Sequence, residues 1–188
     1  MPDRTGTITS VREWVPVSTS AKGRLALRAL EEFGALGFDA VNVADVATAA
    51  GVTTGSLYHH FGSKLGLYGF VRAEAERRLL DRMEGAAAAR AGDGPAAAIR
   101  SALLVGFDFA TSQRFARLLG EPHPARDLDP VAELLAQIGD GGRTPIARML
   151  AAAWREALIA VASGVPAADA RAGVGALTVD EGLLSSAA

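Results

Sequence analysis

Apolar residues recur at helical spacing along most of the chain, and no segment shows the alternation of apolar and polar residues that is typical of a strand. The pattern is clearest over residues 145–161, where apolar side chains follow one side of an expected helix from end to end. Proline and glycine residues separate successive apolar segments, as they do at the ends of helices. The sequence therefore predicts an all-α fold.

Capping residues predict four helices in the N-terminal part of the chain. Ser, Thr and Asn side chains accept hydrogen bonds from the free N–H groups at the start of a helix, and Gly is common where a helix ends. The second and third helices are short, and the fourth is long enough to connect two domains. The expected starts and ends, in chain order, are Ser20 (or Thr19) with Gly37, Asn42 with Gly51, Thr53 (or Thr54) with Gly62, and Ser63 with an end near Glu84.

Prolines mark the starts of further helices. Pro95, Pro130 and Pro145 each precede an apolar segment of helical period, and proline is favoured at the first position of a helix. The helix around Phe107 is apolar on nearly all sides, so we expect it to be buried nearly all round. A last helix, weakened by glycines, is expected over residues 170–184. The segments predict a flexible extension (1–20), a domain with its connecting helix (21–84) and a C-terminal domain (85–188).

Length and composition exclude several classes of protein. The chain has 188 residues, a net charge of −2 and no cysteine, which excludes disulfides, thiolate nucleophiles and cysteine-ligated metal sites. No apolar run approaches the roughly 18 residues that cross a bilayer, and the N-terminus lacks the features of a signal peptide. We therefore expect a cytoplasmic protein with no membrane partner. Because neither half of the chain is strongly basic, overall charge does not indicate a nucleic-acid partner.

Residues 42–61, NVADVATAAGVTTGSLYHHF, have the anatomy of a helix-turn-helix. Ala47 is small where two helices would cross, and Gly51 can adopt the positive φ that the turn needs. Between Asp45 and Lys64 no side chain is charged, although the second helix must expose one face. Hydroxyl, imidazole and phenol groups without a carboxylate suit a helix that enters the major groove of DNA. The alternative is that two short helices simply cover the core.

The segment from Lys22 to Val71 resembles the DNA-binding domain of the TetR family of bacterial transcriptional regulators. The resemblance rests on Phe33, Gly37, Phe38, Val46, Ala47, Ala50, Gly51, Val52, Gly55, Leu57, Tyr58, His60, Phe61, Ser63 and Lys64. It implies a three-helix DNA-binding domain that a long fourth helix joins to a helical domain for dimerisation and ligand binding. By position, it implies DNA contacts for Asn42, Thr53, Thr54, Gly55, Ser56, Tyr58, His59, His60 and Lys64.

Two positions depart from the family pattern. Ala44 stands where many members have a basic or longer polar residue, and Leu36 replaces a usual charged residue. These departures leave two outcomes open: weaker DNA affinity, or a larger role for Lys22 and Arg24 at the start of the first helix. We also expect Lys64 to contact a phosphate, because a cation at a helix N-terminus opposes the helix dipole and calls for an external anion.

The resemblance also implies a homodimer and a small-molecule effector, which we expect to be mostly apolar. Small residues beside large ones in the C-terminal helices favour a cavity between them. We place this effector pocket at Phe107, Phe115, His123, Met149 and Trp154. A second apolar face on the helix over residues 145–161 predicts a dimer interface. The residues expected there are Ala152, Ile159, Val174 and Leu177.

No cofactor, metal or catalytic site is predicted. His59 and His60 are adjacent on one helix and point about 100° apart, so they do not form a metal site by themselves. The sequence contains no glycine-rich phosphate loop after a strand and no nucleophile elbow. The sequence therefore predicts no enzymatic activity, and the resemblance to the TetR family implies a ligand-responsive repressor that binds double-stranded operator DNA as a dimer. Two alternatives stay open: an activator of the same family, and a small-molecule-binding protein whose helix-turn-helix is not used on DNA.

Overall fold

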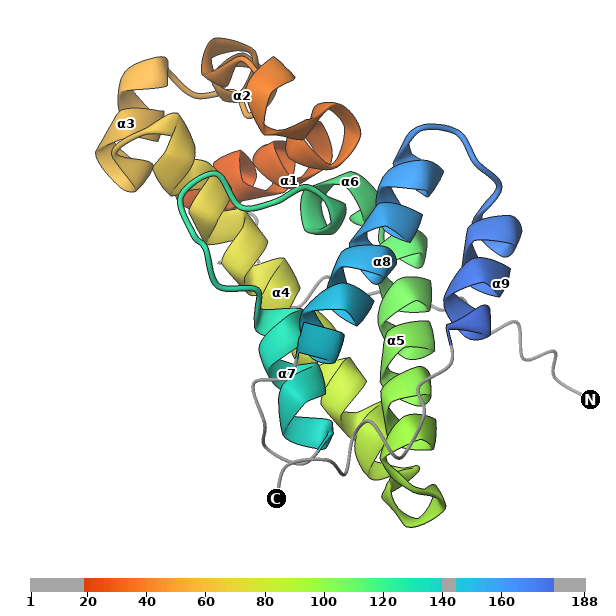
Figure 1. The fold of residues 1–188 in the computed structure, drawn as a ribbon. Coiled ribbons are helices and arrows are strands. Elements are labelled where there is room, and N and C mark those ends of the chain that lie inside the picture. The colour runs from red at the N-terminus through yellow and green to blue at the C-terminus, as the bar shows by residue number, and fades with distance from the viewer. Residues whose placement is uncertain (1–18, 140–144, 178–188) are drawn as a thin grey trace, which may run out of the picture.

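The computed structural model describes residues 19–139 and 145–177, and all regular structure in these ranges is helical (Figure 1). No helix in the described ranges has the length and apolar character needed to span a membrane. The all-α fold predicted from apolar periodicity is therefore confirmed. The elements are α1 (Ala21–Ala40), α2 (Val43–Ala49), α3 (Thr54–Phe61), α4 (Lys64–Ala88), the short 3-10 helix η1 (Ala91–Asp93), α5 (Pro95–Ser112), α6 (Ala116–Gly120), α7 (Pro130–Ile138), α8 (Pro145–Ala162) and α9 (Ala167–Ala176).

Helices α1, α2 and α3 with residues 64–76 of α4 form one end of the molecule, called the head below (Figure 1). Leu25, Val46 and Leu57 are fully buried there, one from each of the first three helices. Gly37 interrupts the helical geometry of α1 with a φ of 80°. The chain turns at this glycine, so Phe38 is directed back onto the head, where its ring centroid lies 5.0 Å from that of Tyr68.

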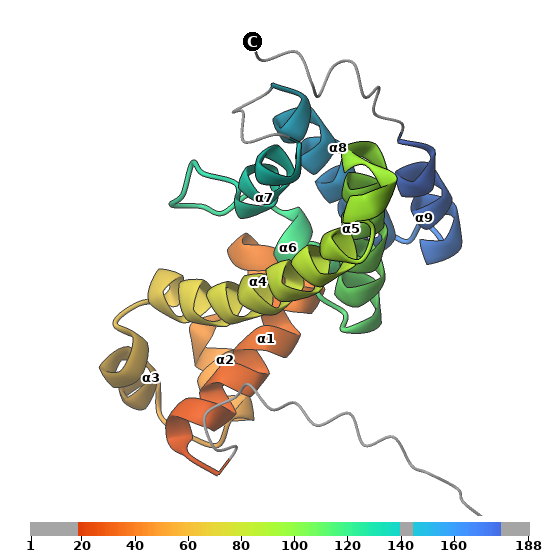
Figure 2. The ribbon, with the colours of Figure 1, turned by 90° about the horizontal axis from the view of Figure 1, so that it is seen from below.

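Helix α4 extends from the head into the rest of the molecule (Figure 2). Its buried residues near the head, such as Leu67, belong to the same apolar cluster as α1, while Leu79 and Met83 lie against α5. A Cβ added at Gly106 of α5 would be only 2.8 Å from the sulfur of Met83. The absence of a side chain at Gly106 therefore allows α4 and α5 to approach closely.

Helix α8 packs against α5, α6, α7 and α9 in the C-terminal part of the chain (Figure 1). Trp154 is fully buried, and its indole N–H donates to the carbonyl oxygen of Leu103 in α5 at 3.0 Å. A single cluster of buried residues extends from α1 to α9. The division near residue 85 therefore stays a prediction, since the core is continuous across it.

The structure confirms the predicted capping residues. Four side chains accept hydrogen bonds from backbone N–H groups in the first turn of their helix: Ser20 from Gly23, Asn42 from Ala44, Thr53 from Ser56 and Ser63 from Gly66. Pro95, Pro130 and Pro145 are the first residues of α5, α7 and α8. Each of these signals depends on a few neighbouring residues, which is why the sequence reveals it.

Helix α4 continues past Glu84 to Ala88, because the alanines there are strong helix formers. Helix α5 is covered on most of its surface, with Val105 exposed. The end of the last helix needs correction. Helix α9 ends at Ala176, earlier than expected. Residues 178–184 of the expected last helix, and most of the extension over 1–20, lie outside the described residues.

A pair of glycine substitutions tests how closely the head approaches the C-terminal part. A Cβ at Gly34 of α1 would lie 2.9 Å from the backbone oxygen of Arg114, whereas a Cβ at Gly69 of α4 would meet nothing within 4 Å. We expect Gly34→Ala to lower the free energy of unfolding by about 1–3 kcal/mol through overpacking. Gly69→Ala should raise it by up to about 1 kcal/mol through helix propensity. Thermal unfolding of both variants measures the difference, and a stabilised Gly34→Ala protein would contradict the close approach.

Candidate nucleic-acid interface

The helix-turn-helix is held by local hydrogen bonds at both of its corners. Asn42 Oδ1 accepts from the N–H of Ala44 at 2.9 Å, and the Thr53 hydroxyl accepts from the N–H of Ser56 at 3.2 Å. In the turn between the helices, Gly51 has a φ of 65°, a conformation that glycine adopts without strain. Asn42 thus fixes the start of α2, while Gly51 and Thr53 lie between the two helices and fix the start of α3.

Helix α3 presents a polar, uncharged surface at the outer end of the head (Figure 1). Leu57 points inward and is fully buried, whereas Tyr58 is 48% exposed. His59 and His60 are exposed in the last turn of the helix. Because no side chain between Asp45 and Lys64 carries a carboxylate, this surface does not repel a phosphate backbone.

The structure brings the nine predicted DNA-contact residues together on α2, α3 and their flanks. Asn42, Thr53, Gly55, Tyr58, His59 and His60 are exposed, and Thr54, Ser56 and Lys64 are partly buried. Asn42 and Thr53 also cap helices, so their oxygens serve the fold before any ligand. The contacts of these residues with DNA stay a prediction.

Lys64 has partners within the chain. Its ammonium nitrogen donates to the carbonyl oxygen of Asp39 at 3.1 Å and lies 4.8 Å from the ring centroid of Phe38. Both partners belong to the turned end of α1 that follows Gly37. The charge of Lys64 therefore needs no external anion to be compensated, contrary to the argument from the helix dipole. A phosphate contact remains compatible with this geometry, because an ammonium group has three donors.

Lys22 and Arg24 also have internal partners. The Lys22 ammonium lies 4.8 Å from the centroid of the Phe70 ring. The Arg24 guanidinium donates to the carbonyl oxygen of Ala50 at 3.0 Å and to that of Thr19 at 2.7 Å. Sequence reasoning missed these contacts, although one signal was available: both lysines of the entire chain lie in this region, close to aromatic residues.

A buried polar group lies at the base of the head. Arg72 and Glu76 of α4 are only 1% and 4% exposed, and they form an ion pair at 2.8 Å. Arg72 also donates to the hydroxyl of Tyr68 at 2.6 Å. Burial raises the pKa of Tyr68 despite the adjacent Arg72. Sequence reasoning did not find this group, because the periodicity of α4 alone does not show which of its charged residues are covered by another segment.

The predicted effector residues do not converge on one cavity. Phe107 and Trp154 are fully buried core residues, and Phe115 is buried as well. Met149 is 70% exposed, on the surface of α8. The His123 ring lies 5.7 Å from that of Tyr68, where burial and the nearby Arg126 lower the pKa of the imidazole. These residues occupy different environments, so the structure gives no support to a pocket made from them.

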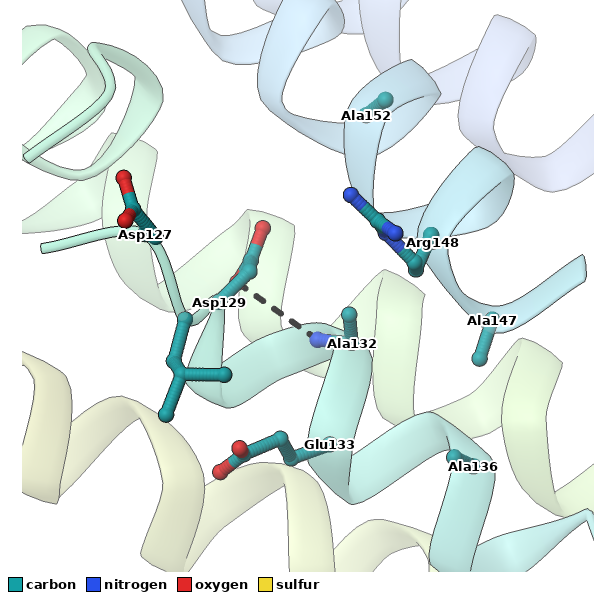
Figure 3. Close-up of a pocket in the computed structure, with 9 residues that line it drawn as sticks. Asp127, Asp129, Ala132, Glu133, Ala136, Ala147, Arg148 and Ala152 are labelled. Carbon is teal, nitrogen blue, oxygen red and sulfur yellow. Dashed lines mark hydrogen bonds between the residues drawn. The ribbon is translucent and has the colours of Figure 1, made fainter. Parts of the chain in front are cut away.

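A different hollow lies between α7, α8 and the segment before α7 (Figure 3). Its volume is about 720 Å³, which is within the range of small-molecule sites. Alanines from α7 and α8 line it, with Asp127 and Asp129 on one side and Arg148 on the other (Figure 3). Arg155 and backbone N–H groups lower the pKa of Asp129, although burial acts in the opposite direction. The hollow thus combines an apolar lining with charged groups.

The predicted dimer residues also occupy different environments. Ala152 is exposed on α8. Ile159 faces α6 of its own chain, close to Gly120, so it does not form a second free face. Val174 is buried and Leu177 is partly buried against the core. The dimer interface therefore stays a prediction, and Ile159 already has a packing partner in its own chain.

Comparison with known proteins assigns the head. Residues 27–69 match the family model described as bacterial regulatory proteins, tetR family. Over these residues the head is similar to bacterial regulatory proteins of the tetR family. The match includes most of α1, all of the helix-turn-helix and the start of α4. No curated protein matches the sequence significantly.

Two solved structures of TetR-family regulators are similar to this chain over most of its length. The regulator PfmR from Thermus thermophilus is 22% identical, with 85% of this chain and 94% of that chain covered and a TM-score of 0.56. A regulator from Streptomyces coelicolor is 18% identical, with 91% and 98% covered and a TM-score of 0.45. The likeness to PfmR shows that the fold, with a tetR-family head and a helical C-terminal part, extends along most of the chain. The chain thus resembles TetR-family transcriptional regulators in its head and in its fold.

Proposed function

We propose that this regulator represses transcription by occupying operator DNA as a homodimer, and that a small molecule modulates its binding. The observation that carries the proposal is the exposed, charge-free surface of α3, fixed by caps at the outer end of a tetR-family head. A dimer bound over an operator excludes other proteins from the same DNA. A regulator that activates instead would bind the same DNA, so the two differ in the transcriptional outcome alone.

Within this surface, the hydroxyls of Thr54 and Ser56 are assigned to base edges, and Tyr58 and Lys64 are assigned to phosphates. Short hydroxyl side chains at the start of a recognition helix suit base contacts in the major groove. Lys64 and Lys22 lie at the border between the head's aromatic residues and its polar surface. The few cations of the head therefore limit the electrostatic part of DNA affinity.

Salt titration of DNA binding tests the function together with the role of Lys64. We expect binding to duplex DNA from upstream of the chain's own coding region, in preference to a scrambled duplex. Lys64→Met should weaken binding to both duplexes and reduce the slope of log K against log salt by about one unit, the value for one neutralised phosphate. Fluorescence anisotropy at several salt concentrations measures both quantities.

The matched control is Arg90→Met, which removes an exposed cation far along the chain from the head. An unchanged salt slope in Lys64→Met would restrict Lys64 to its internal contacts with Asp39 and Phe38. Equal affinity of the unmodified protein for the upstream and scrambled duplexes would favour the alternative in which the helix-turn-helix is not used on DNA.

We place the dimer interface on the exposed side of α8, next to α9. Met149, Ala152, Ala153 and Glu156 are exposed there. A hollow of about 320 Å³ between α8 and α9 is lined mainly by small residues, including Ala153, Ala160 and Gly173. Small residues permit close helix packing, and the exposed Met149 supplies an apolar side chain to fill a hollow of this kind. This face keeps Val174 and Leu177 of the sequence-based interface, since both line the hollow, and leaves out Ile159, which packs against α6. Ala152 lies at its edge and also lines the hollow between α7 and α8.

Ala153→Glu tests this interface without disturbing the core, because Ala153 is exposed in the single chain. We expect monomers in light scattering, an unchanged helical content and at least tenfold weaker operator binding, because a buried unpaired carboxylate opposes association. Ala73→Glu on the exposed side of α4 is the matched control and should remain dimeric. A folded, dimeric Ala153→Glu protein would move the interface elsewhere.

We assign the effector to the hollow between α7 and α8. The alanine lining suits a mostly apolar molecule, and Asp127, Glu133 and Arg148 suit polar groups at its edges. This placement replaces the core site at Phe107 and Trp154, since both side chains are already fully packed. The expected effector is still a mostly apolar molecule, and we now expect it to carry polar groups that face the rim of the hollow.

A thermal-shift screen of small molecules, repeated on Ala136→Phe, tests this site. A compound at 100 times its dissociation constant raises the free energy of unfolding by about 2.7 kcal/mol. Ala136 lines the hollow, so a phenyl ring there should abolish the shift produced by compounds that stabilise the unmodified protein. Ala88→Phe, at an exposed position of α4, is the control. If a compound still stabilises Ala136→Phe but no longer stabilises Phe107→Leu, the effector site lies in the core around Phe107.

A further inference from the structure

The connection between α6 and α7, residues 121–129, contacts the head at two points. In Figure 1 this connection extends from α6 across α4 before it returns to α7. Glu121 contacts the turned end of α1, and Arg126 contacts the middle of α4. The connection is therefore the part of the C-terminal region that touches two separate helices of the head through polar groups.

The first contact depends on Gly37. The carboxylate of Glu121 lies directly over Gly37, where a Cβ would overlap it, and Oε2 accepts a hydrogen bond from the N–H of Phe38 at 3.3 Å. Phe38 follows the break in α1 at Gly37. Its N–H therefore lies outside the regular i to i−4 hydrogen bonding of the helix. Glu121 therefore satisfies a backbone group that the kink exposes, and in doing so it fixes the end of α1.

Glu121 is in turn connected to α8 through Arg117. One terminal nitrogen of Arg117 lies 3.4 Å from Oε1 of Glu121, and the other donates to the carbonyl oxygen of Ala162 at 3.2 Å. Ala162 is the last residue of α8, where free carbonyl groups favour a cation. The end of α1 is thus linked to the end of α8 by two side chains.

The second contact inserts into the buried polar group of α4. Arg126 reaches Oε2 of Glu76 at 3.1 Å, while Oε1 of the same carboxylate accepts from Arg72 at 2.8 Å. Two guanidinium groups therefore share one carboxylate that is almost completely buried. Arg72 continues to Tyr68, whose ring packs edge-on against Phe33 and Phe38. Arg126 thus gives the second oxygen of Glu76 an ion-pair partner, in a group that supports both α1 and α4.

The far end of the connection is also anchored to α8. Arg155 holds the carboxylate of Asp129 with two hydrogen bonds, at 2.7 and 2.6 Å, and a further nitrogen contacts the carbonyl oxygen of Leu119. Paired bonds of this kind restrict orientation as well as distance. Residues 121–129 are therefore held by α8 at both ends while they contact the head in between.

We propose that Glu121 and Arg126 are positioning residues that fix the orientation of the head relative to α8. This inference rests on the proposed function, in which α8 carries the dimer interface and α3 reads DNA. In such a dimer, the orientation of each head on its own α8 determines the distance between the two α3 helices. Operators recognised by dimers have half-sites at a defined separation for this geometric reason.

The two residues act on spacing and not on base recognition. Their partners, Phe38 and Glu76, lie at the base of the head, and the contacts that set the direction of α3 run through Asn42, Gly51 and Thr53. Removal of either side chain, Glu121 or Arg126, therefore leaves the reading surface intact. It lets the head rotate about the middle of α4, and a small rotation there is amplified at α3.

Selection of binding sites from a library of random DNA duplexes separates these two properties, because the sequenced pool reports half-site sequence and half-site spacing independently. The full-length dimer should select two half-sites at one separation. Glu121→Ala and Arg126→Gln should select the same half-site sequence with separations spread over at least one additional base pair. Glu121→Gln, whose amide oxygen can still accept from Phe38, should give a narrower spread than Glu121→Ala.

Glu84→Gln, on the exposed side of α4, is the control and should reproduce the unmodified spacing. An unchanged spacing in folded Glu121→Ala and Arg126→Gln proteins would overturn the inference, and so would a changed half-site sequence. Arg126 is partly exposed, so its variant carries the test if Glu121→Ala does not fold. Failure of the unmodified protein to select any DNA would instead overturn the proposed function, which distinguishes the two.

Discussion

A buried ion pair in the middle of α4 joins the head to the C-terminal helices. Taking Arg72 and Glu76 out of water is costly, and the pair is tolerated only when additional hydrogen bonds satisfy its remaining donors and acceptors. Tyr68 supplies one such partner from the head, and Arg126 supplies another from the connection between α6 and α7. The pair therefore has its full set of partners only when the head, α4 and this connection are in their observed places.

The positive charges of the head are arranged behind its reading surface. Lys22, Arg24 and Lys64 contact aromatic rings or backbone carbonyl groups that join α1 to its neighbours. Helix α3 itself has no formally charged residue at neutral pH. A surface of this kind favours hydrogen bonding over charge neutralisation, and phosphate attraction then comes from the border of the surface. The same cations thus stabilise the head through contacts within the chain.

Local signals in the sequence predict the helices, whereas long-range contacts determine much of the candidate site. The caps at Asn42 and Thr53 each involve residues two or three positions apart, so their identity alone predicts them. The bridge from Glu121 to Phe38 joins residues 83 positions apart, and no periodicity points to it. The spacing of apolar residues also does not show which element covers a given face of a helix. Ile159 packs against Gly120 of its own chain, while Met149 on the same helix is exposed.

Helix α8 connects all three of the proposed activities, because its sides have different neighbours. One side packs on α6 through Ile159, the exposed side is the one assigned to a second copy, and the side toward α7 borders the hollow assigned to an effector. Asp129 lines that hollow and is held by Arg155 of α8, only three residues along the chain from Arg126 at the buried ion pair. A ligand that displaces Asp129 by even a small amount therefore acts on a segment whose other contacts end at the head. The path from the hollow to α4 consists of three residues of chain and the ion pair between Arg126 and Glu76, so it does not pass through the apolar core.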